Sequence, residues 1–228
     1  MIYVFDLDGT LCPIGKPVSE KTVAGLWELE ARGHGVALCS GKPTYYLCGM
    51  ARQLGLCHPI LIGENGGVIQ LGVHLPPEHF YIVTNRKKTL SFFREKRAEL
   101  AEKYGDLVWF QPNESMLTVF PRDLSLFDAL EEDLSPARAL GCKIYRFVDC
   151  FDVVPDDVGK GKGLSFLAEL TGCTPDDFIA VGDGENDYPM FAFARHSVGI
   201  SLKDESRARV NVSSIDEALE HLLKEDTE

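Results

Sequence analysis

The first acidic residues of the chain are spaced in a way that suits metal-assisted phosphoryl chemistry. Asp6 and Asp8 are separated by one residue and are followed by Gly9 and Thr10. Two carboxylates at this spacing can converge on one hard cation, and magnesium prefers oxygen ligands. A carboxylate can also attack phosphorus and form an aspartyl-phosphate. An acidic turn after a strand has the same composition, because Asp and Gly are common turn residues. The pair alone therefore leaves both interpretations open.

The element before this pair would place it at a ligand-binding edge. Residues 2–5 are all apolar, which is typical of a buried strand in a parallel sheet. Open α/β sheets bind ligands at the carboxyl ends of their strands. Asp6 and Asp8 would lie at such an end, and this position favours the catalytic interpretation.

Three further segments place polar residues where a strand ends or a helix begins. Apolar runs at 36–39 and 178–181 lead into polar residues flanked by glycine, and a glycine-rich segment at 158–163 precedes a predicted helix. The residues that these segments contribute are Ser40, Gly41, Lys160, Asp183, Asn186 and Asp187. Lysine at 162 is an alternative to Lys160, because it also has glycine on both sides.

An aspartate pair, a serine, a lysine and an acidic Gly-Asp loop, in this order, resemble the four motifs of the haloacid dehalogenase superfamily. The resemblance extends through nearly the whole chain. It implies a Mg²⁺-dependent phosphatase in which Asp6 is the nucleophile and Asp8 the general acid and base. Lys160 would hold Asp6 in place and neutralise developing charge.

The same resemblance implies where the metal and the phosphate bind. The implied magnesium ligands are the Asp6 side chain, the Asp8 backbone carbonyl and Asp183. Asp187 would bind the ion directly or through water, or would orient Asn186 and its loop. Ser40 and the Gly41 amide would bind a phosphoryl oxygen, since glycine permits a close approach of the backbone.

One position departs from the family pattern and bears on the substrate. Many sugar phosphatases of this type have Thr-Gly-Arg where this chain has Ser40-Gly41-Lys42, and lysine does not reproduce the bidentate contacts of arginine. The segment 64–67 is more similar to archaeal-type phosphoglycolate phosphatases and to the sucrose- and mannosylphosphoglycerate-phosphatase group. A small carboxylated phosphate or a sugar phosphate is therefore implied.

The predicted elements divide the chain into a frame and an insert. Residues 1–76 and 156–228 read as an α/β core with a Rossmann-like parallel sheet, in which Ser19 and Ser214 cap helices. Residues 77–155, with strands near 80–83, 107–110, 116–120, 143–147 and 151–154 and helices at 87–104 and 124–134, read as a small α+β domain. The resemblance implies a C2B-type cap. The insert's basic candidates for substrate contact are Arg86, Lys87, Lys88, Arg122 and Arg146.

The composition of the chain indicates which binding partners and which cellular compartment to expect. The net charge of −12, from 23 basic and 35 acidic residues, argues against nucleic acid and anionic membranes. No apolar run approaches the roughly 20 residues that span a bilayer, and no secretory signal is visible. Seven cysteines without a Cys-x-x-Cys pair argue against zinc and against a dithiol redox site, and they favour a cytoplasmic protein. We expect a small phosphorylated metabolite as partner and a monomer or homodimer.

Two other functions remain open on the sequence. A phosphomutase of the phosphomannomutase type would use the same machinery, but no second phosphate-binding motif is evident. A non-catalytic binding protein on this fold would not need Asp6, Asp8, Lys160 and Asp183 together.

Overall fold

The strands that precede the candidate site residues lie in one eight-stranded sheet. Its order is β12-β11-β10-β1-β2-β3-β4-β5. The strands are β1 (Ile2–Phe5), β2 (Gly35–Cys39), β3 (Ile60–Gly63), β4 (Val68–Leu71), β5 (His79–Ile82), β10 (Phe178–Gly182), β11 (His196–Ile200) and β12 (Val210–Val212). The pairs from β12 through β3 are parallel, and β4 runs antiparallel to β3. The carboxyl ends of β10, β1 and β2 therefore meet at one edge.

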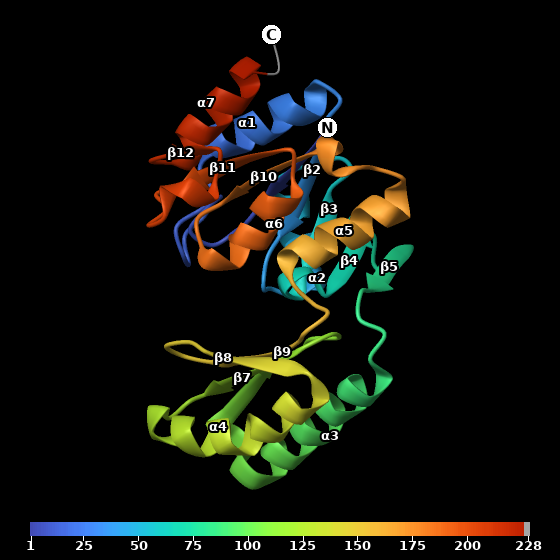
Figure 1. Ribbon diagram of the computed structural model, residues 1–228, viewed down its shortest axis with the longest axis vertical. Coiled ribbons are helices and arrows are strands. Elements are labelled where there is room, and N and C mark those ends of the chain that lie inside the picture. The colour runs from blue at the N-terminus through green and yellow to red at the C-terminus, as the bar shows by residue number, and fades with distance from the viewer. Residues whose placement is uncertain (226–228) are drawn as a thin grey trace. The chain divides into compact units, whose positions relative to one another are not determined.

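Helices of the same unit cover this sheet. They are α1 (Glu20–Ala31), α2 (Thr44–Gln53), α5 (Lys160–Thr171), α6 (Tyr188–Phe193) and α7 (Ile215–Glu225). Buried residues of α1, α2 and α7 share one hydrophobic core with Tyr3 and Phe5 of β1. In Figure 1, α5 and α6 lie in front of the sheet. The helical segment after β10 begins with a 3₁₀ turn, Glu185–Asp187, and becomes α-helical only at Tyr188.

A second unit has its own sheet and core. Strands β6 (Val108–Gln111), β7 (Leu117–Pro121), β8 (Cys142–Arg146) and β9 (Phe151–Pro155) form an antiparallel sheet in the order β6-β7-β9-β8. Its core also includes residues of α3 (Lys87–Tyr104) and α4 (Phe127–Leu134). A 3₁₀ helix, Ser135–Leu140, follows α4 directly, so the helical segment continues past Pro136 with a change of helix type. The α/β fold with a separate α+β unit is confirmed.

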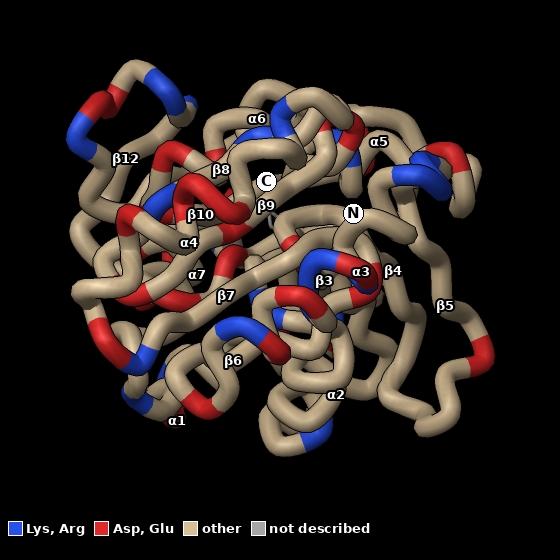
Figure 2. Tube along the Cα trace, turned by 90° about the horizontal axis from the view of Figure 1, so that it is seen from below, with Lys and Arg blue, Asp and Glu red and all other residues tan. Residues whose placement is uncertain are grey.

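The chain divides into two compact units, each of which makes its contacts mainly within itself. Residues 1–81 and those from 159 onward form the first unit, and residues 82–158 form the second. The computed structural model describes residues 1–225, and residues 226–228 of the predicted core range lie outside the described residues. Lys and Arg residues are interspersed with Asp and Glu along the trace (Figure 2). None of the helices among residues 1–225 has the length and hydropathy needed to cross a bilayer.

Two strands of the main sheet differ from the sequence prediction. The strand predicted near 80–83 as part of the insert is β5, and it lies at the edge of the main sheet beside β4. The residues of this strand do not reveal which sheet it joins, because the same short run could pair with β4 or with a strand of the insert. At the other edge, β12 was not predicted, since three residues are too few to show a period.

The N-cap of α1 gives a direct test of this part of the fold. The Ser19 hydroxyl accepts a hydrogen bond from the Thr22 amide at 3.0 Å, which satisfies one of the free amides of the first turn. We expect Ser19→Ala to lower the free energy of unfolding by about 1 kcal/mol, measured by urea denaturation. The control is Ser165→Ala inside α5, where alanine is the better helix former. Equal losses in the two variants would contradict the capping role.

Candidate active site

Three neighbouring parallel strands each end directly before a candidate residue. Asp6 follows β1, Ser40 follows β2 and Asp183 follows β10. The Asp6 amide donates to the Val181 carbonyl of β10 at 2.9 Å, and the Ser40 amide donates to the Ile62 carbonyl of β3 at 2.9 Å. The sheet hydrogen bonding thus continues through the first residue after β1 and β2, which holds these residues in place.

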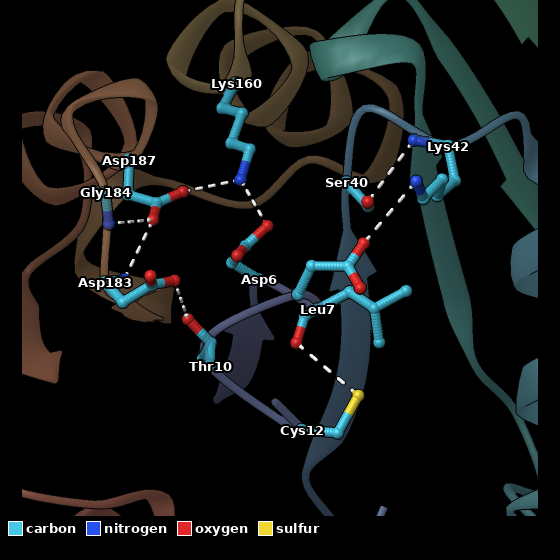
Figure 3. A network of polar contacts seen from close by, with 11 residues as sticks. Asp6, Leu7, Thr10, Cys12, Ser40, Lys42, Lys160, Asp183, Gly184 and Asp187 are labelled. Atoms are coloured by element: carbon cyan, nitrogen blue, oxygen red, sulfur yellow. Dashed lines mark hydrogen bonds and ion pairs between the residues drawn. The ribbon is translucent and has the colours of Figure 1, made fainter. Parts of the chain in front are cut away.

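A buried lysine joins two of the aspartates. Lys160 Nζ donates to Asp6 Oδ1 and to Asp187 Oδ1, each at 2.5 Å (Figure 3). The Lys160 side chain is 1% exposed, and those of Asp6 and Asp187 are 9% and 0% exposed. Lys162, the alternative in the sequence, is exposed. The lysine that contacts the aspartates is therefore Lys160.

Asp187 also organises the loop after β10. Its Oδ2 atom accepts hydrogen bonds from the amides of Asp183 at 3.0 Å and Gly184 at 2.9 Å (Figure 3). A side chain at position 182 would overlap this carboxylate, so Gly182 is needed for its close approach. Asp187 therefore links Lys160 to the backbone that carries Asp183.

A tight turn after β1 brings Thr10 to the same loop. The Gly9 amide donates to the Cys12 carbonyl at 2.8 Å, so the chain folds back after Asp8. The buried Thr10 hydroxyl then donates to Asp183 Oδ1 at 2.7 Å. Gly9 has a φ of +93°, and a Cβ there would overlap the Asp183 carboxylate. The sequence analysis did not include Thr10 among the site residues, although a hydroxyl directly after the aspartate pair and glycine was the available signal.

Burial and neighbouring charges shift the pKa values of the central ionisable groups in opposite directions. Burial raises the pKa values of Asp6 and Asp187 above their ordinary range, although Lys160 counteracts this effect at both. Burial alone would lower the pKa of Lys160, but the two carboxylates outweigh it and the pKa lies above the usual value. The lysine is therefore a fixed positive charge at neutral pH.

The segment after β2 places Ser40 and Lys42 beside Asp8. Ser40 Oγ accepts from the Lys42 amide at 3.2 Å, and Lys42 Nζ lies 3.7 Å from Asp8 Oδ2 (Figure 3). The Lys42 and Asp8 side chains are 39% and 30% exposed, so this ion pair is weak. A Cβ on Gly41 would lie 3.4 Å from the Asn65 side chain, which brings the turn after β3 against this segment. The sequence analysis did not pair Lys42 with Asp8.

Close backbone packing positions the first turn of α5. A side chain at position 66 would overlap the Gly159 carbonyl, and a Cβ at Gly163 would lie 2.8 Å from the Gly66 Cα. Two glycines thus allow the turn after β3 to rest directly on the start of α5. Because Lys160 is the first residue of that helix, this contact helps to set the direction of its side chain.

The acidic groups of the site fit a hard divalent cation. Oxygen atoms of Asp6, Asp183 and Asp187 all lie within 4.8 Å of one another. The Thr10 hydroxyl donates to one oxygen of Asp183, which leaves the other oxygen available to coordinate an ion. Three carboxylates close to one lysine leave a surplus of negative charge, and carboxylate oxygens are suitable ligands for magnesium. The residues present therefore fit this metal.

The remaining predicted residues are less closely tied to the cluster. Asn186 is exposed, and its Oδ1 atom would lie 2.5 Å from a Cβ on Gly184. In the second unit, Arg86 contacts Asp157 at 3.3 Å, and Arg146 contacts Asp128 and Glu131 at 3.0 Å. Both arginines thus have acidic partners within their own unit. The other basic candidates, Lys87, Lys88 and Arg122, are exposed.

Comparison with known proteins shows relatives of similar length. The profile of the haloacid dehalogenase-like hydrolases matches residues 3–123 and 79–207. A phosphoglycolate phosphatase of Methanococcoides burtonii is 30% identical over 202 residues, which cover 88% of this chain and 83% of the relative. One from Methanopyrus kandleri is 28% identical over 211 residues, with 92% and 88% covered.

Solved structures show the same fold at lower identity. A haloacid dehalogenase-like hydrolase from Bacteroides thetaiotaomicron superposes with a TM-score of 0.78 at 20% identity, covering 97% of this chain and 98% of the other. A sugar phosphatase of subclass IIB superposes with a TM-score of 0.68 at 19% identity, with 97% and 98% covered. The fold, the clustered aspartates and the two matched sequence ranges lead to one conclusion: the chain belongs to the haloacid dehalogenase-like hydrolase family.

Proposed function

We propose that the protein is a Mg²⁺-dependent phosphatase that hydrolyses a small phosphorylated metabolite through an aspartyl-phosphate. The observation that carries this proposal is the buried contact of Lys160 with Asp6 and Asp187, beside Asp183. A nucleophilic carboxylate needs nearby positive charge to approach an anionic phosphate. Lys160 supplies one such charge, and the acidic cluster can hold another.

In this mechanism, Asp6 and Asp8 divide the chemistry. Lys160 holds Asp6 Oδ1, so the second carboxylate oxygen is the atom that attacks phosphorus. A bond forms from that oxygen to phosphorus as the bond to the leaving oxygen breaks, and Asp8 donates a proton to the leaving oxygen. Asp8 then takes a proton from water, which attacks the phospho-aspartate and releases phosphate. The partial exposure of Asp8 is compatible with contact to substrate and water.

The surrounding residues hold the charges in place. Asp6 and Asp183 would hold Mg²⁺, with the Asp8 carbonyl as a further ligand, and the ion would supply electrostatic stabilisation of the phosphoryl oxygens. Asp187 acts mainly as a positioning residue, because its oxygens accept from Lys160 and two backbone amides. Ser40 and the Gly41 amide would bind a phosphoryl oxygen, and Lys42 adds a charge near Asp8.

The relatives narrow the class of substrate. Phosphoglycolate phosphatases of several archaea match more than four-fifths of the chain. We therefore place phosphoglycolate first and sugar phosphates second. Lys42 agrees with this order, because many sugar phosphatases of this type have an arginine at the position. Asn186, exposed in the 3₁₀ turn before α6, is a candidate substrate contact.

A substrate panel tests the reaction and the metal together. We expect phosphate release from phosphoglycolate or from one class of sugar phosphate in the presence of Mg²⁺. Release should fall to background with EDTA and return when Mg²⁺ is added in excess. Nucleotides and glucose 1,6-bisphosphate complete the panel. Transfer of phosphate within a sugar without release would indicate a mutase, and no turnover of any compound would contradict the proposed function.

The nucleophile is tested by an isosteric substitution. Asp6→Asn should reduce kcat by about 10³-fold or more, because an amide cannot form the phospho-enzyme. It should leave the protein folded, since it removes a buried charge and leaves Lys160 paired with Asp187. The matched control is Asp176→Asn on the surface, which should retain full activity. Retention of most activity by the Asp6 variant, with a native circular dichroism spectrum, would rule out this mechanism.

A pair of glycine substitutions tests the packing behind Asp183. Gly9→Ala would push a methyl group into the Asp183 carboxylate, and we expect a loss of about 100-fold in kcat/KM with a higher Mg²⁺ requirement. Gly33→Ala is the control, because Gly33 has a similar φ of +83° but open space around its Cβ position. The two variants share the backbone strain of about 1 kcal/mol or more. Equal activities would show that the contact with Asp183 is unimportant.

A further inference from the structure

A second group of metal-binding side chains lies at the other end of the main sheet. His196 is the first residue of β11, and it is paired with Ile179 near the start of β10. Asp183, in contrast, follows the end of β10. His221 and Glu225 lie one turn apart on α7. One ligand atom from each of His196, His221 and Glu225 lies within 4.8 Å of the others.

The distances in this group are too long for hydrogen bonds and suit an ion between the side chains. Nε2 of His221 lies 3.4 Å from Glu225 Oε1, and Nε2 of His196 lies 3.7 Å from Glu225 Oε2. An N–H···O hydrogen bond spans about 2.7–3.2 Å. Ligands of a tetrahedral zinc ion, with bonds of about 2.0–2.1 Å, are separated by about 3.3–3.4 Å. Each imidazole nitrogen therefore lies at about the separation of two zinc ligands from one oxygen of Glu225.

The Nε2 atoms of the two imidazoles make no hydrogen bond with any of the described residues. Nε2 of His196 and Nε2 of His221 are both shielded from solvent, and neither has a hydrogen-bond partner within residues 1–225. A buried polar atom without a partner carries a desolvation cost that lowers stability. The ring centroids are 5.9 Å apart, with the planes inclined by 34°. A ligand that accepts both nitrogens would remove this cost.

The chemistry of the group distinguishes it from the aspartate site. Two histidines and one carboxylate form a donor set that zinc uses with water as fourth ligand. Magnesium prefers oxygen alone. A histidine binds metal through an imidazole nitrogen, and Nε2 of each ring lies in this group without a hydrogen-bond partner among residues 1–225.

The elements that carry the group are firmly packed. Leu219 and Leu222 of α7 are buried in the main core. Arg32 of α1 donates to the Leu223 carbonyl at 2.8 Å, which satisfies part of the last turn of α7. His221 and Glu225 are thus presented by a helix whose position is fixed by other contacts. An ion bound here would join the end of α7 to β11.

We propose that His196, His221 and Glu225 form a second metal site, which takes a zinc-type transition-metal cation and clips the C-terminal helix to the sheet. The cysteine pattern argued against zinc, but the ligands proposed here are two histidines and a glutamate from β11 and α7. The site is independent of phosphate hydrolysis, since the candidate catalytic aspartates lie at the opposite ends of the strands.

Metal titration of the full chain tests this proposal. With excess Mg²⁺ present to occupy the aspartate site, we expect wild-type protein to bind one equivalent of Zn²⁺ by calorimetry. Co²⁺ in place of Zn²⁺ should give the visible spectrum of a four-coordinate N/O site, without the charge-transfer band of a thiolate ligand. Zn²⁺ should also raise the melting temperature. His196→Gln and His221→Gln should each weaken Zn²⁺ binding by at least about tenfold and lose this temperature shift.

Two further variants keep the test independent of folding and of other ligands. Glu225→Gln alters an exposed side chain that should not affect folding, and it should also weaken Zn²⁺ binding. His74→Gln replaces an exposed histidine outside the group and should bind Zn²⁺ as the wild type does. All four variants should keep Mg²⁺-dependent phosphate release. Unchanged Zn²⁺ affinity in the His221 and Glu225 variants, or no Zn²⁺ binding by the wild type in excess Mg²⁺, would overturn the proposal.

Discussion

The buried contact of Lys160 with Asp6 and Asp187 is the interaction on which the rest of the site depends. A buried charge without a partner costs several kcal/mol, so none of these three groups is tolerable in this position alone. The contact joins the end of β1, the first turn of α5 and the loop after β10. These three elements come from distant parts of the sequence. Their assembly into one site is therefore coupled to the folding of the whole first unit.

Glycine residues make this assembly possible, because they have no side chain to fill the space between neighbouring elements. Gly66 and Gly163 bring the turn after β3 onto α5, and Gly182 leaves room for Asp187. Gly9 lets the chain turn back so that Thr10 reaches Asp183. At each of these glycines, backbone or carboxylate atoms lie in the space that a side chain would fill. The result is a rigid arrangement in which the negative charges are close together and only partly balanced by Lys160.

The two ends of the main sheet provide different donor sets. At the carboxyl ends of the strands, aspartates and hydroxyls offer oxygen atoms. At the opposite end, two histidines and a glutamate offer nitrogen and oxygen. Because hard cations prefer the first set and zinc-type cations accept the second, the fold can hold two metals without competition between them. One would serve the reaction and the other would stabilise the terminal helix.

The local pattern of the sequence was sufficient for most elements and for the aspartates. Runs of apolar residues predicted β1, β2 and β10, and an abrupt change to Asp or Ser marked where β1 and β2 end. The hydroxyl of Ser19 marked the start of α1. These features depend on residues that are close together in the chain, because the spacing of apolar residues and the capping of helices are local properties of the sequence.

The tertiary structure alone decided which distant groups meet. The sequence left Lys160 and Lys162 as alternatives, and only the packing of α5 buries the first and exposes the second. It likewise placed β5 in the main sheet, Thr10 against Asp183, and the His196 and His221 rings side by side. The sequence by itself determined the elements and the type of chemistry, because these follow from local order. Partners across the fold were decided by the tertiary structure, because backbone pairing and close packing act between residues whose separation along the chain carries no signal.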